Sequence, residues 1–286
     1  MSANLHIYDS GGMGRPIVLI HGFPLSHEAF HHQFDDLENA GLRVIAYDRR
    51  GFGKSDKQSD GFDYDTLADD LKRVIDQLAL HDAILLGFSM GGGEVARFAS
   101  RHSLDGIAGV IFAAAVPPCL LKSEDNPDGP LDRKTADEKL AAITTDRSAY
   151  FESFVKKFYS VKNEVVVDET ELQSAIRLCE QSDQQAAIAC MKSFSFTDFR
   201  NDLRHITVPT LIIHGDCDAI VPVEGSGYRT FKSIPGSKIS LIAGGPHGIN
   251  VSHSDEFNEL VIQFSESLPS AQVQSNTLKG ATNVNR

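Results

Sequence analysis

The sequence predicts an α/β fold in which helices cover both faces of a mostly parallel sheet. Short apolar runs rich in β-branched residues recur along the chain, and helical patterns separate them. Strands that are buried on both faces read as continuous apolar runs, whereas half-exposed strands alternate. A third observation is a long interval with helical patterns alone, which predicts a helical insertion into the α/β core.

The expected strands are IVLI at 17–20, RVIAY at 43–47, AILL at 83–86, GVIFAAA at 109–115, TLIIHG at 210–215 and KISLIA at 238–243. The clearest helix between them covers 66–80, where apolar residues recur at a spacing of three and four. Thr66 and Asp69 are expected to form a capping box at its start.

The alternation of strands and helices breaks between 118 and 201. A polar loop, KSEDNPDGP, is followed by four helical stretches: TADEKLAAI, SAYFESFVKKFY, ETELQSAIRLCE and QQAAIACMKSF. We therefore expect 1–117 and 202–269 to form the α/β core and 118–201 a helical cap without strands. Residues 270–286 are small and polar and show no periodicity, so we expect a disordered tail.

The composition excludes several classes of function. Lys and Arg number 27 against 39 Asp and Glu, and the net charge of −12 repels nucleic acid and anionic membrane surfaces. No signal peptide is recognisable and no apolar run is long enough to span a bilayer, so we expect a soluble, cytoplasmic protein. The four cysteines form no CxxC pair, so we expect reduced thiols and no metal site.

The pentapeptide Gly87-Phe88-Ser89-Met90-Gly91 lies between an expected strand and an expected helix. That context is typical of a nucleophile elbow, a sharp turn that presents a serine oxygen above the sheet. A serine at a helix start also lies beside free backbone N–H groups. We therefore predict that Ser89 is the nucleophile and that the N–H of Met90 is one oxyanion donor.

A serine nucleophile needs a histidine base that is oriented by a carboxylate. His247 lies in a Gly-Pro loop after the last strand and is the predicted base, whereas His21 and His214 adjoin strand ends and are expected to bond to the backbone. Asp216 and Asp218 both follow a strand. We predict that Asp218 orients the base and that the Asp216 side chain forms a hydrogen bond to the backbone of its own turn.

The second oxyanion donor is expected in the loop after an early strand, His21-Gly22-Phe23-Pro24. Pro24 has no N–H, which leaves the N–H of Phe23 as the natural donor.

Taken together, HGFPLS, YDRRGFGKSD, GFSMGGGEVAR, TDFR, VPTLIIHGDCDAIVP and GGPHG resemble the cofactor-free haloperoxidase and aryl esterase branch of the α/β-hydrolase family. The resemblance runs from about residue 17 to 268 and is weakest in the cap. It implies an eight-stranded sheet with a helical cap, the catalytic group Ser89, Asp218 and His247, and oxyanion donors at Phe23 and Met90. It also implies hydrolysis of carboxylic esters without a cofactor, peracid formation from a carboxylic acid and hydrogen peroxide, and a homo-oligomer in many members.

One residue departs from the family pattern, because Phe23 stands where the family usually has tryptophan. The smaller ring enlarges the acyl pocket and removes an N–H. The DRRGFGKS segment is expected to brace loops near the elbow rather than to bind phosphate. The residues expected to line the substrate pocket are Phe23, Pro24, Phe154, Phe158, Phe194 and Ile220.

The predicted function is a serine hydrolase that cleaves aryl or alkyl esters through an acyl-enzyme and has perhydrolase side activity. An amidase or lactamase would use the same three side chains. A ligand receptor that turns over slowly would also keep them, but it would stall after about one equivalent of product.

Overall fold

The computed structural model describes residues 3–269. Within that range a sheet of seven strands runs through the molecule in the order β1-β3-β2-β4-β5-β8-β9. Only β1 is antiparallel to its neighbour, and every other pair is parallel. The strands are β1 (Ile7–Asp9), β2 (Pro16–Ile20), β3 (Arg43–Tyr47), β4 (Ala83–Phe88), β5 (Ile107–Ala113), β8 (Thr210–Gly215) and β9 (Lys238–Ile242).

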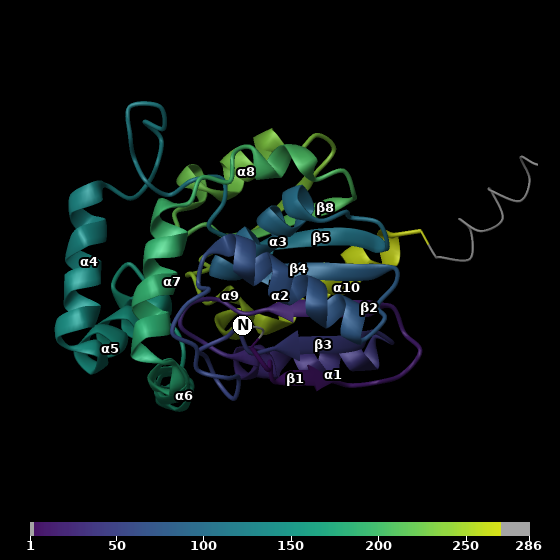
Figure 1. The fold of residues 1–286 in the computed structure, drawn as a ribbon, viewed down its shortest axis with the longest axis horizontal. Coiled ribbons are helices and arrows are strands. Elements are labelled where there is room, and N and C mark those ends of the chain that lie inside the picture. Colours follow the sequence, from purple (N-terminus) through teal and green to yellow (C-terminus); the bar gives the residue numbers. More distant parts are fainter. Residues whose placement is uncertain (1–2, 270–286) are drawn as a thin grey trace, which may run out of the picture.

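Helices cover both faces of the sheet (Figure 1). α2 and α3 pack against each other in front of the strands in this view, and α1 and α10 pack against each other behind them. β2, β4 and β8 are buried almost throughout, as their continuous apolar sequences predict. The helices of the core are α1 (His31–Asn39), α2 (Tyr64–Gln77), α3 (Met90–Arg101), α8 (Gly227–Ser233), α9 (Ile249–Ser252) and α10 (Ser254–Ser267).

The expected α/β class and parallel sheet are confirmed, but the expected eight strands are wrong for the described residues. The chain ahead of β1 does not add a strand to the edge, because its backbone is bonded to the loop after β3. The Asn4 carbonyl accepts from the N–H of Asp56, and the His6 carbonyl accepts from the N–H of Asp48. Residues 4–6 therefore lie alongside the chain that follows β3 and form no further strand.

The expected start of the helix at 66–80 is also wrong. α2 begins at Tyr64, and Asp63 is its N-cap, with a carboxylate oxygen that accepts the N–H of Thr66 at 3.0 Å. A second Asp63 oxygen accepts the Thr66 hydroxyl at 2.9 Å. Thr66 therefore lies inside the first turn, because an ionised carboxylate at Asp63 satisfies the free N–H groups better than a hydroxyl three residues later.

Four helices follow the core strand β5 and gather at one end of the sheet, at the left of Figure 1. They are α4 (Arg133–Thr145), α5 (Arg147–Phe158), α6 (Glu169–Gln181) and α7 (Gln184–Phe196). A small hairpin, β6 (Ser160–Val161) with β7 (Glu164–Val165), interrupts them, so the expectation of a strand-free segment is wrong. Its strands are too short to produce a periodic pattern, and Lys162 and Asn163 form its turn with positive φ angles.

The predicted tail, 270–286, lies outside the described residues. Among residues 3–269, none of the helices combines the length and the apolar character that crossing a bilayer requires.

Candidate active site

Ser89 lies between β4 and α3, at the carboxyl end of a central strand. Its backbone is in a strained conformation, with φ 54° and ψ −116°. Its N–H donates to the Ala113 carbonyl at 2.8 Å, and its carbonyl accepts from Gly92 and Val116, each at 3.1 Å. These bonds to the neighbouring strand and helix hold the strained turn in place and fix the direction of the side chain.

Two glycines allow this turn to form. A Cβ atom at Gly87 would lie 2.6 Å from the Gly91 carbonyl oxygen, and a Cβ atom at Gly91 would lie 2.3 Å from the Ile20 carbonyl oxygen. Each contact is with backbone, which cannot rotate out of the way as a side chain would. The glycines that flank Ser89 are therefore required by close packing between β2, β4 and the start of α3.

We expect Gly91→Ala to lower the free energy of unfolding by about 1–3 kcal/mol, because its methyl group must displace β2 at Ile20. Urea unfolding followed by circular dichroism measures this change. An unchanged midpoint would show that β2 can move without cost, contrary to the packing described above.

The structure brings Ser89, His247 and Asp218 together. Along the chain, His247 is 158 residues from Ser89 and 29 residues from Asp218. The Ser89 Oγ–H group donates to His247 Nε2 at 2.8 Å. His247 Nδ1 lies 2.6 Å from Asp218 Oδ2 and donates to it, because a carboxylate oxygen can only accept. The imidazole is thereby held in the tautomer that leaves Nε2 free to take a proton from the serine.

Asp218 is held as a carboxylate by the groups around it. Burial alone would raise its pKa, but the nearby charge of His247 and hydrogen bonds from His214 and His247 outweigh burial and hold the pKa well below its usual range. The second oxygen accepts the N–H groups of Ile220 and Val221, each at 2.8 Å. Asp218 therefore remains negative at neutral pH, next to the imidazole that it orients.

The other candidates from the sequence have different partners. Asp216 accepts the N–H of Gly244 in the next loop at 2.7 Å, so its expected bond to its own turn is wrong. His21 is bonded to the Gly22 carbonyl at 2.8 Å, and His214 to the Val221 carbonyl at 2.8 Å. Both imidazoles are buried, and their contacts with backbone oxygens agree with the expected backbone bonding.

The loop after β2 lies directly beside Ser89. A Cβ atom at Gly22 would lie 3.0 Å from the Ser89 Cβ, which places Phe23 next to the serine. Within residues 3–269, neither the N–H of Phe23 nor that of Met90 donates a hydrogen bond to another protein group. Both amides are therefore available to an oxygen bound in front of Ser89.

Two aromatic rings hold the His247 imidazole. Phe88, from β4, has its ring centroid 5.6 Å from that of the imidazole. Phe158, from the end of α5, lies 4.9 Å away and meets the imidazole edge-on at 85°. The Phe158 carbonyl also accepts the N–H of Gly248, next to the histidine, at 3.0 Å. The imidazole is thus packed between the core and one of the helices at the end of the sheet.

A cavity of about 180 Å³ opens in front of Ser89. Of the residues predicted to line a substrate pocket, Phe23, Phe154, Phe194 and Ile220 line it. Pro24 and Phe158 do not: Pro24 is buried within its loop, and Phe158 packs on His247. The remaining lining residues are Val116, Leu120, Pro130, Leu131, Asp132, Thr135, Lys139, Tyr150, Lys157, Ser195, Ala219, Val221 and Pro222.

A buried ion pair braces the turn that carries Ser89. Arg49 Nε donates to Glu94 Oε1 at 2.5 Å, and its NH2 group donates to the His21 carbonyl at 2.7 Å. Tyr47 Oη donates to the other Glu94 oxygen at 2.7 Å. Because Glu94 is on α3 and His21 precedes Phe23, this ion pair ties the helix that follows Ser89 to the loop beside it. The segment 48–55 was expected to brace loops near the elbow, and Arg49 does so through Glu94, which was not among the expected residues.

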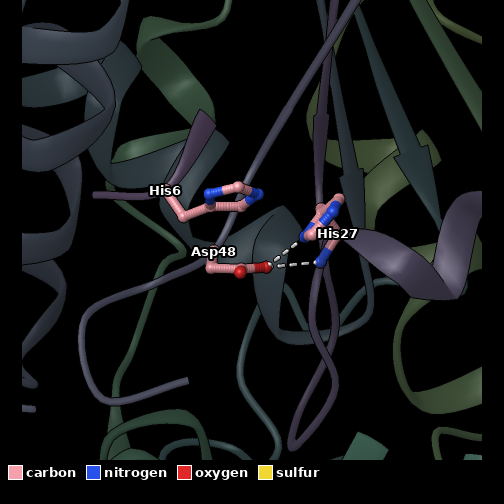
Figure 2. A group of neighbouring side chains, drawn as sticks. All are labelled: His6, His27 and Asp48. Atoms are coloured by element: carbon pink, nitrogen blue, oxygen red, sulfur yellow. Dashed lines mark hydrogen bonds and ion pairs between the residues drawn. The ribbon is translucent and has the colours of Figure 1, made fainter. Parts of the chain in front are cut away.

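Two groups of side chains in residues 3–269 could offer ligand atoms to a metal, and neither includes Ser89, His247 or Asp218. One is His31 and His32 with Glu171; the other is His6, His27 and Asp48 (Figure 2).

The carboxylate of the second group already has partners. Figure 2 shows one Asp48 oxygen bonded to both the backbone and the ring of His27, each at 2.7 Å. The other Asp48 oxygen accepts the N–H of Lys54 at 2.8 Å. Asp48 therefore serves to hold two loops together, and the prediction that this protein needs no metal stays a prediction.

Asp48 gives the fold a pH-dependent contribution. Burial raises its pKa, but the bonds from His27, the charge of His21 and backbone N–H groups outweigh burial and lower the pKa to about 2. A pKa below that of the unfolded chain adds stability that is present above about pH 4 and is lost as the pH falls toward 2.

The expected contribution is about 2 kcal/mol. We expect Asp48→Asn to lower the urea midpoint at pH 7 and to flatten the decline of stability between pH 5 and 3. Parallel declines for the wild type and the variant would contradict this assignment.

The comparisons with known proteins agree with this fold. Residues 15–254 match the family model for the alpha/beta hydrolase fold. A non-heme haloperoxidase of Rhodococcus erythropolis is 37% identical over 91% of this chain and 95% of its own. A bifunctional esterase/perhydrolase of Acinetobacter calcoaceticus is 33% identical over 90% and 94%. The crystal structure of a bromoperoxidase from Bacillus anthracis superposes with a TM-score of 0.91 at 45% identity, over 93% of this chain and 96% of that one.

A parallel sheet with a serine, a histidine and an aspartate meeting at its carboxyl edge defines an enzyme of the hydrolase type. The chain belongs to the α/β-hydrolase fold family, in the branch that contains non-heme haloperoxidases and an esterase/perhydrolase. The resemblance noted from its sequence motifs is therefore confirmed.

Proposed function

We propose that the protein is a serine esterase that works through an acyl-enzyme on small-molecule carboxylic esters. The observation that carries this proposal is the continuous chain of hydrogen bonds from Ser89 Oγ through His247 to Asp218, at 2.8 and 2.6 Å. The esterase/perhydrolase of Acinetobacter calcoaceticus supports the same assignment by similarity.

The reaction begins when Ser89 Oγ attacks the ester carbonyl and His247 Nε2 takes the serine proton. The N–H groups of Phe23 and Met90 hold the oxyanion, and Asp218 stabilises the charged imidazole. When the tetrahedral intermediate collapses, the alcohol leaves with the proton from His247 and the acyl group stays on Ser89. Water, deprotonated by the same imidazole, then releases the carboxylic acid and restores the serine.

Hydrogen peroxide can replace water in the second half of the reaction. Its oxygen attacks the acyl-enzyme, Ser89 regains its proton through His247, and a peracid leaves in place of the acid. The peracid oxidises bromide to hypobromite and returns to the carboxylic acid, so this side activity needs no cofactor. The non-heme haloperoxidase relative supports it by similarity.

The test is a side-by-side assay on one preparation: hydrolysis of 4-nitrophenyl acetate, hydrolysis of the matching 4-nitroanilide, and peroxide-dependent bromide oxidation. We expect many turnovers on the ester, far fewer on the anilide, and bromide oxidation only with peroxide and a carboxylic acid. A fluorophosphonate should label Ser89 and abolish all of them. A halt after one equivalent of product would indicate a receptor, and faster cleavage of the anilide would indicate an amidase.

We further propose that the enzyme works in the cytoplasm, where thiols are kept reduced. Cys119, Cys179, Cys190 and Cys217 are all free in the structure.

The division into a core of 1–117 and 202–269 with a cap of 118–201 remains our proposal for the domain organisation of the protein. We also propose that the protein forms a homo-oligomer, which size-exclusion chromatography with light scattering would reveal.

A further inference from the structure

Two lysines from different helices line the cavity in front of Ser89. Lys139 comes from α4 and Lys157 from α5. Lys139 is partly buried and Lys157 is exposed. Within residues 3–269, neither ammonium group forms an ion pair or a hydrogen bond. The cavity thus has two cationic groups that have no partner in the part of the chain that the structure describes.

The two ammonium groups are close enough to act on each other. Burial lowers the pKa of Lys139, and the positive charge of Lys157 lowers it further. Asp132 also lines the cavity, but its two oxygens accept the N–H and the hydroxyl of Thr135, each at 2.8 Å, as the N-cap of α4. Asp132 is the one carboxylate in this lining and its charge raises the pKa of Lys139, but within residues 3–269 it forms no ion pair with either lysine.

Most of the other side chains that line the cavity are apolar. Phe23, Phe194 and Ile220 line the same cavity as Ser89, and Phe154 and Tyr150 come from α5 with Lys157. A ligand that reaches from Ser89 to the lysines would have a reactive end at the serine, an apolar middle and a far end beside the two ammonium groups. An anionic far end would satisfy both cations at once.

We propose that the cavity binds esters that carry a carboxylate at the end remote from the ester carbonyl, and that Lys139 and Lys157 hold that carboxylate. This inference rests on the proposed esterase function and names its substrate class. The lysines determine specificity and take no part in bond making or breaking, because the proton transfers run through Ser89 and His247. Their effect is therefore on the binding of the substrate and falls mainly on KM.

The test compares two matched esters, the 4-nitrophenyl monoester of adipic acid and 4-nitrophenyl hexanoate, which differ in the terminal carboxylate. We expect Lys139→Met to lower kcat/KM for the adipate ester about 10- to 100-fold, as for a lost hydrogen bond to a charged group. The hexanoate ester should change less than about threefold. Lys157→Met should act in the same direction, and Lys139→Arg should recover part of the loss.

A second arm places the carboxylate on the alcohol side, with 4-carboxyphenyl butanoate against phenyl butanoate. A lysine-dependent preference in either arm supports the proposal and identifies the side of the ester that carries the anion. Lys134→Met is the matched control, because Lys134 is on α4 with a side chain that is 87% exposed and is absent from the cavity lining.

The two hypotheses fail in different ways. If neither ester is turned over by the wild type, the proposed esterase function is wrong. If the neutral esters are turned over and the lysine variants change charged and neutral esters equally, or change neither, the esterase stands and the inference about substrate charge is overturned.

Discussion

Ser89→Ala is expected to lower kcat for 4-nitrophenyl acetate by about 10⁶-fold, because the attacking oxygen is removed and the imidazole and carboxylate have nothing left to activate. Peroxide-dependent bromide oxidation should fall with it, since both reactions pass through the same acyl-enzyme. The measurement is steady-state release of nitrophenolate and bromination of a dye, with circular dichroism to show that the variant is folded.

Ser233→Ala is the matched control for this experiment. Ser233 ends α8, its hydroxyl donates to the Arg229 carbonyl at 2.8 Å, and it does not line the cavity. This variant should keep both activities. A folded Ser89→Ala protein that keeps either activity would refute the acyl-enzyme mechanism for that reaction.

Arg49→Met is expected to cause the largest loss of stability among single substitutions near the site, about 3–5 kcal/mol. The Arg49 and Glu94 side chains are 1% and 0% exposed, so the variant leaves a carboxylate buried without its cation. Burial raises the pKa of Glu94 even with Arg49 present, and Tyr47 alone cannot replace the guanidinium. Guanidinium chloride unfolding measures the change in the free energy of unfolding.

Two further variants distinguish the loss of the buried Arg49–Glu94 ion pair from the loss of a positive charge at any position. Arg101→Met removes an arginine whose side chain is 41% exposed and pairs with Asp69, so it should cost no more than about 1 kcal/mol. Arg49→Met combined with Glu94→Leu should recover part of the loss, because no unpaired charge is then buried. If Arg49→Met and Arg101→Met lowered the free energy of unfolding equally, the burial of the Arg49–Glu94 ion pair would not be the cause of the loss.

The main elements of the sheet were predictable because they are buried on both faces. The runs at 43–47 and 210–215 have the bounds of β3 and β8, since nothing but continuous apolar sequence suits such positions. β1 was missed because it has three residues at the edge of the sheet and none of them is fully buried. Short edge strands depend on pairing partners that a local pattern does not contain.

The candidate site was predictable where the backbone geometry imposes particular residues. Gly87 and Gly91 are needed for the turn at Ser89, and loops after adjacent parallel strands bring Asp218 and His247 to the same edge. Lys139 and Lys157 were not predictable, since each is one of two lysines on its helix and the sequence does not show which of the two faces the cavity. Phe158 was assigned to the pocket because sequence does not reveal which ring faces substrate and which supports the base.

The packing of Phe158 on the His247 imidazole has a consequence for protein engineering. A chimera that exchanged the segment from α4 to α7 for that of a relative would also exchange Phe158, which packs on the proposed general base His247, and the carbonyl that accepts the N–H of Gly248. The chimera would then acquire the substrate specificity of the relative together with altered packing around the His247 imidazole. A downstream boundary after Gly248 rather than after α7 would avoid that coupling, because Phe158 and His247 would then come from one parent.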